Sequence, residues 1–132
     1  MWKRTMLCVA IALTAMAYAS GPAAAQQDAI KRTILQRSDV PGTNYETVLG
    51  IAEIAPNAQV ALHTHPGTET SYLLEGSLSL QIQGQPPQAL QAGQSFHVPA
   101  VAPHGGHAGP TGAKVLATWV VEKGKPLASP VK

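Results

Sequence analysis

The residues of this chain best suited to chemistry are two histidines one position apart, followed by a turn and a glutamate. His63 and His65 are expected on the same face of a β-strand, because side chains alternate sides along a strand. Pro66-Gly67 is typical of a turn, so the next strand brings Glu69 back toward the two imidazoles. His104 supplies a third imidazole. Three neutral ring nitrogens and one carboxylate oxygen form a ligand set for a divalent first-row transition metal.

These residues fall in two blocks that resemble the two motifs of the cupin family. The first cupin motif reads G-x5-H-x-H-x3-E-x6-G, and the second reads G-x5-P-x-G-x2-H-x3-N. The resemblance spans residues 57–108. Seven positions match in order, namely His63, His65, Glu69, Gly76, Gly93, Pro99 and His104.

Three motif positions depart from the family pattern. Asn57 replaces the first glycine, and it is expected to be harmless because Asn tolerates left-handed backbone geometry. Ala108 replaces the final asparagine, which is not a family metal ligand. Val101 replaces the glycine between Pro99 and His104, and a β-branched residue takes a positive φ only with difficulty. The turn before His104 is therefore expected to differ from the family pattern.

The resemblance implies an all-β fold, a single antiparallel jelly-roll (cupin) β-barrel. Short β-rich segments separated by Gly and Pro independently favour an antiparallel barrel or sandwich. The expected organisation is a signal peptide (1–25), an N-terminal arm (26–43), the cupin barrel (44–122) and a C-terminal tail (123–132). Within the arm, Ile34 and Leu35 either pack or add an edge strand. The expected strands are 45–54, 59–65, 70–74, 77–83, 88–90, 95–98 and 114–121.

The amino terminus has the pattern of an export signal. Lys3 and Arg4 precede an apolar run over residues 6–19, and Ala23-Ala24-Ala25 suits cleavage before Gln26. The apolar run is short for a membrane span. We therefore expect a secreted or periplasmic protein with no stable membrane insertion after the signal is cleaved.

Charge and cysteine content limit the partners. Without residues 1–25, nine basic residues become seven, against seven acidic ones, so the formal net charge falls from +2 to zero. No basic stripe argues for nucleic acid, and Arg32 and Arg37 are expected to be solvated. The remaining chain has no cysteine and is small, so a homodimer is expected to help stabilise it.

The other polar and aromatic residues receive mostly structural interpretations. His97 is expected on a strand, facing away from the metal, and His107 in a loop, with a contact to substrate as the alternative. Tyr72 and Trp119 are expected to pack in a core or an interface, and Glu75 at the rim.

Function is less constrained, because fold and metal site do not define chemistry. The leading hypothesis is a metal-dependent, quercetinase-like dioxygenase that binds Fe, Mn, Ni, Cu or Zn and acts on a small chelating enol or catechol. Glu69 would be both metal ligand and catalytic base, since no other acidic residue has a strong claim to the barrel interior. One alternative is a non-catalytic barrel that binds or senses a small sugar or carboxylate. Another is a metal-dependent lyase or isomerase, with Tyr72 or His107 as acid or base.

Overall fold

The part of the chain that the structure describes is all-β and contains eight strands. A computed structural model describes residues 29–131, so the predicted signal peptide lies outside the described residues. Within this range no helix is long and apolar enough to cross a membrane. The strands are β1 (Ile30–Asp39), β2 (Tyr45–Ile54), β3 (Gln59–Thr64), β4 (Gly67–Ile82), β5 (Gln88–Gln91), β6 (Ser95–Val98), β7 (His104–Glu122) and β8 (Ser129–Pro130).

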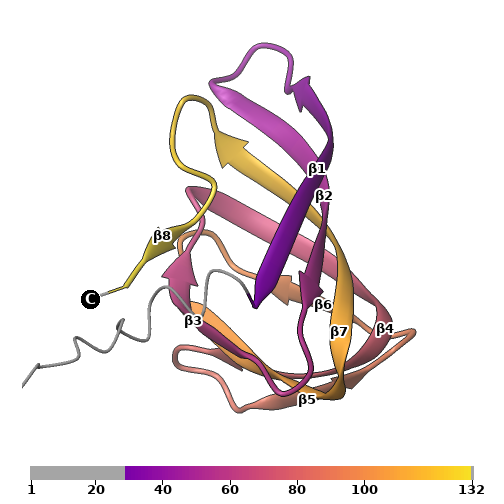
Figure 1. Ribbon diagram of the computed structural model, residues 1–132. Coiled ribbons are helices and arrows are strands. Elements are labelled where there is room, and N and C mark those ends of the chain that lie inside the picture. Colours follow the sequence, from indigo (N-terminus) through magenta and orange to yellow (C-terminus); the bar gives the residue numbers. More distant parts are fainter. Residues whose placement is uncertain (1–28, 132) are drawn as a thin grey trace, which may run out of the picture.

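Two long strands, β4 and β7, run through both halves of the fold and pair with each other along their length (Figure 1). One half has the strand order β1-β2-β7-β4-β6 and the other has the order β8-β3-β7-β4-β5. All of these pairings are antiparallel. The result is the jelly-roll arrangement that was predicted, although backbone hydrogen bonds do not close the strands into a complete ring.

The two halves meet at a bend in β4 and β7. The β4–β7 register shifts between Leu73 and Glu75, and again between Gly76 and Leu78. Gly76 has φ +77°, and a Cβ there would lie 2.0 Å from the carbonyl oxygen of Gly112. Only glycine fits this corner without a backbone shift. The sequence predicted two strands, 70–74 and 77–83, but the structure has one bent strand.

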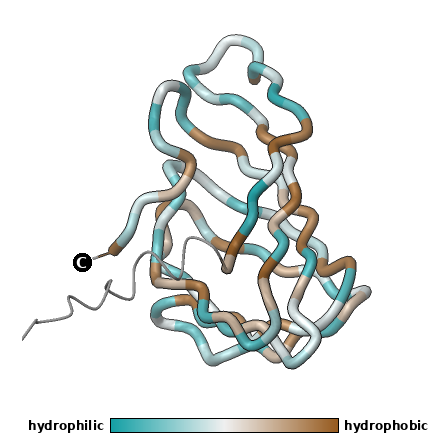
Figure 2. The backbone as a smooth tube through the Cα atoms, in the orientation of Figure 1, coloured by the Kyte–Doolittle hydropathy of each residue, from teal (hydrophilic) through white to brown (hydrophobic). Residues whose placement is uncertain are grey.

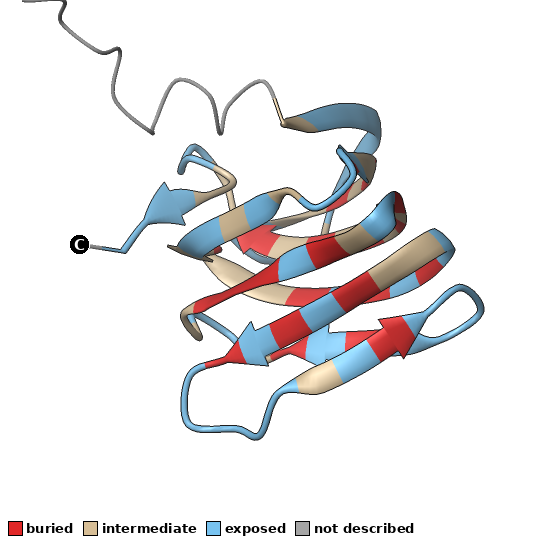
Figure 3. Ribbon diagram, turned by 60° about the horizontal axis from the view of Figure 1, so that its bottom comes forward, coloured by how far each residue is buried: buried red, intermediate tan, exposed pale blue. Residues whose placement is uncertain are grey.

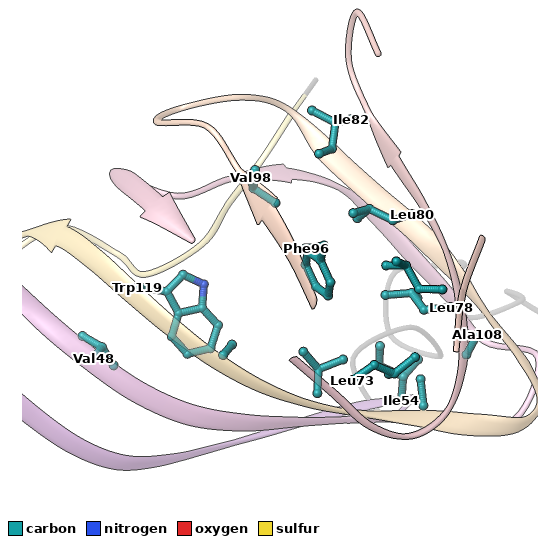
Figure 4. Close-up of a cluster of buried hydrophobic side chains, with 14 of the residues drawn as sticks. Val48, Ile54, Leu73, Leu78, Leu80, Ile82, Phe96, Val98, Ala108 and Trp119 are labelled. Atoms are coloured by element: carbon teal, nitrogen blue, oxygen red, sulfur yellow. The ribbon is translucent and has the colours of Figure 1, made fainter. Parts of the chain in front are cut away.

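The core lies between the two halves. Hydropathy and burial alternate along the strands, as expected when one face of each strand is turned inward (Figures 2 and 3). Figure 4 shows Phe96 in the middle of this cluster, with Trp119 on one side and Leu78 and Leu80 on the other. Each of these four side chains is at least 92% buried.

Both flanking segments take part in the sheets. The segment expected as an N-terminal arm contains β1, which pairs with β2 as an edge strand and has a bulge at Leu35. The segment expected as a tail contains β8, which pairs with β3 at His63 and Thr64.

Between residues 29 and 131, two non-glycine residues have a positive φ, and both are motif departures. Asn57 has φ +57°, as its tolerance of left-handed geometry predicts. Val101 has φ +59°, so the prediction that its turn must differ from the family pattern was wrong. The turn is closed by a hydrogen bond from Ala102 N–H to Pro99 O, which places Val101 where turns often need a positive φ. Its N–H also donates to Gly67 O, which holds the turn in place.

Candidate metal centre

Three imidazoles converge at one end of the core. His63 on β3 is the direct register partner of His104 on β7, and His65 follows on the turn after β3. The ring centroids lie 4.2 Å apart for His63 and His104, 4.9 Å for His63 and His65, and 5.0 Å for His65 and His104. One ring nitrogen of each residue lies within 4.8 Å of the others. Three histidines of this arrangement could hold a metal ion.

Backbone carbonyls define the tautomer of all three rings. The Nδ1–H of His63 donates to the oxygen of Ala61 at 2.8 Å, and that of His104 donates to Ala102 at 3.0 Å. The Nδ1–H of His65 donates to Leu127 at 2.6 Å. A ring nitrogen facing a carbonyl must carry the hydrogen, so each Nε2 presents its lone pair to the site. Histidine ligands of metals are commonly oriented in this way.

Glu69 lies beside these nitrogens and is only 6% exposed. Its Oε2 is 2.8 Å from Nε2 of His65 and 3.5 Å from Nε2 of His104. Its Oε1 accepts a 2.6 Å hydrogen bond from the hydroxyl of Ser71. The indole N–H of Trp119 donates to Oε2 at 3.0 Å and to Nε2 of His65 at 3.1 Å.

The chemistry of this donor set fits a bound cation. With Nδ1 protonated, Nε2 of His65 and Oε2 of Glu69 are two acceptors facing each other at 2.8 Å, which is unfavourable unless a positive charge lies between them. Nitrogen and oxygen ligands lie about 2 Å from a first-row metal ion, so atoms at this separation can share one ion. The role of Glu69 as the fourth ligand stays a prediction.

The environment keeps Glu69 ionised and His63 neutral. Burial alone would raise the pKa of Glu69, but hydrogen bonds donated to its carboxylate, such as that from the hydroxyl of Ser71, outweigh burial and hold the pKa well below its usual range. Burial lowers the pKa of His63 to about 4, although its bond to Ala61 opposes the shift. Metal ligands must be deprotonated, so both groups are in a suitable state at neutral pH.

The site opens into a cavity of about 50 Å³ between the two halves. A cavity needs about 10–15 Å³ to hold one water molecule, so this volume accommodates roughly four molecules of that size. The wall is mainly apolar, with side chains such as Ile54, Phe96 and Val115. The polar lining consists of His63, His65, Glu69, His104, the indole nitrogen of Trp119 and Arg32.

The remaining candidates lie away from this cavity. Tyr72 is 45% exposed, and His97 is exposed between the buried Phe96 and Val98, as predicted for a strand residue facing away from the metal. His107 is exposed on β7 and lines a separate surface groove, so the predicted loop is a strand. Glu75 is exposed and pairs with Lys114 at 3.7 Å. A lyase that uses Tyr72 or His107 therefore has no support in this geometry.

Three contributors to the site were not identified from the sequence. Trp119 was expected only to pack, but it also donates to Glu69. Leu127 acts through its backbone oxygen, which no side-chain pattern reveals. Arg32 was expected to be solvated; it is exposed, but it also lines the cavity. Arg32 lies two positions after Ile30 on the same edge strand, so the two side chains share a face. This spacing is the signal that could have indicated its place in the cavity wall.

Comparison with known proteins agrees with this architecture. A model of the cupin domain matches residues 50–121. The dimethylsulfoniopropionate lyase DddW of Ruegeria pomeroyi is 41% identical over 69 residues, which are 52% of this chain and 45% of DddW. The chain thus spans less than half the length of that relative.

Solved structures with the same fold include two enzymes. The DMSP lyase DddQ from Ruegeria pomeroyi superposes with a TM-score of 0.67 at 20% identity, over 82% of this chain and 53% of DddQ. The polyketide cyclase RemF from Streptomyces resistomycificus gives 0.59 at 28% identity, over 79% of this chain and 72% of RemF. The domain match covers more than half of the chain, so the chain belongs to the cupin family and contains a small cupin domain.

Proposed function

We propose that this protein is a metal-dependent lyase that acts on a small molecule. The observation that carries the proposal is the convergence of three Nε2 lone pairs and the ionised Glu69 at the wall of a small, mainly apolar cavity. Such a site combines a place for a metal ion with a nearby carboxylate, in surroundings that limit water.

The relatives favour a lyase over the quercetinase-like dioxygenase expected from the sequence. DddW, the relative with 41% identity over 69 residues, is a dimethylsulfoniopropionate lyase. Dimethylsulfoniopropionate is accordingly the first substrate to test.

The proposed reaction is an elimination. The carbon next to the substrate carboxylate loses a proton, its electron pair forms the new double bond, and the carbon–sulfur bond breaks. The sulfur leaves with its electron pair as dimethyl sulfide, and acrylate remains. A bound divalent metal would supply Lewis-acid polarisation of a substrate oxygen.

The residues of the chain supply the proton acceptor and its orientation. Glu69 is the one carboxylate among the described residues that line the cavity, so we assign the proton to it. Ser71 and Trp119 hold its two oxygens in place. The lowered pKa of Glu69 makes it a weak base, so we expect slow turnover.

A non-catalytic barrel that binds a small carboxylate is the second candidate. The observation that favours it is the exposure of Tyr72 and His107, which leaves the cavity without a further acid or base. The two candidates differ in whether a bound ligand is converted.

The test is dimethyl sulfide release from dimethylsulfoniopropionate by protein loaded separately with Fe, Mn, Ni, Cu or Zn. Bound metal is measured by elemental analysis in the same samples. We expect release with at least one metal and its loss in His104→Ala, while the exposed control His107→Ala retains both metal and activity. Metal-loaded protein that binds the substrate without cleaving it would support the binding barrel instead. Oxygen consumption with a catechol, and no dimethyl sulfide, would restore the dioxygenase.

A further inference from the structure

The cavity contains one strongly basic side chain, and its place on an edge strand explains how it reaches the site. β1 lies along β2 (Figure 1), and Arg32 is the register partner of Ala52. Ile30, Ala52 and Ile54 line the same cavity, so this face of the β1–β2 pair is turned toward the metal centre. Lys31 points to the other face and pairs with Glu53 at 3.9 Å.

Small residues on β2 leave room for the long side chain. Gly50 and Ala52 share the face of β2 that Arg32 covers, because they lie two positions apart. Gly50 is packed closely by Trp119 and Ile34, where a Cβ would lie 3.1 and 3.4 Å from their side chains. Arg32 therefore lines the cavity beside the short side chain of Ala52.

The side chain of Arg32 has no hydrogen bond or ion pair with any residue in the range 29–131. The other arginine of the same strand, Arg37, is paired with Glu46. Glu69 attracts Arg32 through space but is already bonded to Ser71 and Trp119. Burial lowers the pKa of Arg32, and this attraction opposes the shift. Arg32 is exposed, so its guanidinium, which no side chain pairs, is available to a ligand at the wall of the cavity.

We propose that Arg32 is a specificity-determining residue that anchors the carboxylate of a small substrate in the cavity. The planar guanidinium matches the two oxygens of a carboxylate and forms paired hydrogen bonds with it. A carboxylate held there would leave the rest of the ligand in the cavity that His63, His65 and His104 also line. This inference rests on the proposed function for the site, and it adds the charge and the orientation of the substrate.

The test measures the binding of propionate, used as the probe, to the metal-free protein. Binding is followed by NMR or by calorimetric titration. Arg32→Met removes the charge and keeps much of the length, and Arg32→Lys keeps the charge without the fork. Lys31→Met is the matched control on the opposite face of the same strand. We expect propionate binding to weaken about 10- to 100-fold in Arg32→Met and less in Arg32→Lys, with no change in Lys31→Met. Neutral propionamide should not bind measurably to the unmodified protein.

Three results would overturn the anchor. The first is equal propionate binding by Arg32→Met and the unmodified chain. The second is no saturable binding by either protein when thermal unfolding shows that both are folded. The third is equal binding of propionamide and propionate. The readout needs neither metal nor turnover, so it separates this inference from the lyase. Binding through Arg32 without dimethyl sulfide release refutes only the lyase, whereas lyase activity with an unchanged KM in Arg32→Met refutes only the anchor.

Discussion

The Nδ1–H of His65 donates a 2.6 Å hydrogen bond to the backbone oxygen of Leu127, 62 residues farther along the chain. His65 is 3% exposed, and this contact turns its Nε2 toward His63, His104 and Glu69. The carboxyl-terminal segment is thereby part of the candidate metal centre, because it determines the orientation of one of the three rings.

Removal of this segment should weaken metal binding. A chain that ends at Lys125 lacks Leu127 and β8, and we expect its zinc affinity to fall about 10- to 100-fold, since lost support of a ligand has effects of that size. Competition with a chelating dye measures the affinity. The matched control ends at Pro130, which removes only the hydrogen bond from Val131 N–H to Leu62 O. Equal zinc affinities of the two truncated chains would show that the Leu127 contact does not support His65.

Ser71→Ala should destabilise the protein through Glu69. The substitution leaves Oε1 of a buried, ionised carboxylate without its 2.6 Å hydrogen bond, so we expect the free energy of unfolding to fall by about 1.5–3 kcal/mol. Urea unfolding measures the change. Ser79→Ala on the same strand is the control, because Ser79 is exposed. The interpretation fails if both substitutions have the same small effect.

Val101→Gly should stabilise the turn before His104. Val101 is 61% exposed with φ +59°, so its side chain gains little from packing and strains the backbone. Glycine relieves the strain but loses more chain entropy on folding, which leaves a gain of about 0.5–1 kcal/mol. Thermal unfolding compares this variant with Val101→Ala, which keeps the Cβ and should show no such gain. A Val101→Gly variant no more stable than Val101→Ala would mean that the positive φ is not strained.

The metal-free protein should lose stability as the pH falls from about 6.5 to about 4. In this window an unfolded His63 binds a proton, while the folded one, with its pKa lowered to about 4, does not. The unfolded state is then favoured by the extra proton, by at most about 3 kcal/mol for this residue. Urea unfolding across the pH series should show a shallower slope for His63→Gln than for His97→Gln, whose side chain is exposed. Identical slopes in the two variants would assign the pH dependence to other groups.

Much of the site could be predicted from the sequence because its signals are local. The i, i+2 spacing of His63 and His65, the Pro66-Gly67 turn and the return to Glu69 all act within a few residues. The motif spacing to His104 added the third imidazole, and the structure places it directly opposite His63. Strand alternation likewise predicted the buried face that holds Phe96 and Val98.

Tertiary structure decided what depends on pairing between distant segments. The bend that keeps β4 as one strand requires Gly76 to face Gly112, and the orientation of His65 requires a carbonyl from the carboxyl-terminal segment. Arg32 reaches the cavity because β1 pairs with β2 in one particular register. The local sequence determines which face of a strand a side chain occupies. The residues that this face contacts depend on which strand pairs beside it and in which register. Contacts with backbone atoms do not depend on side-chain type, so the sequence does not reveal them.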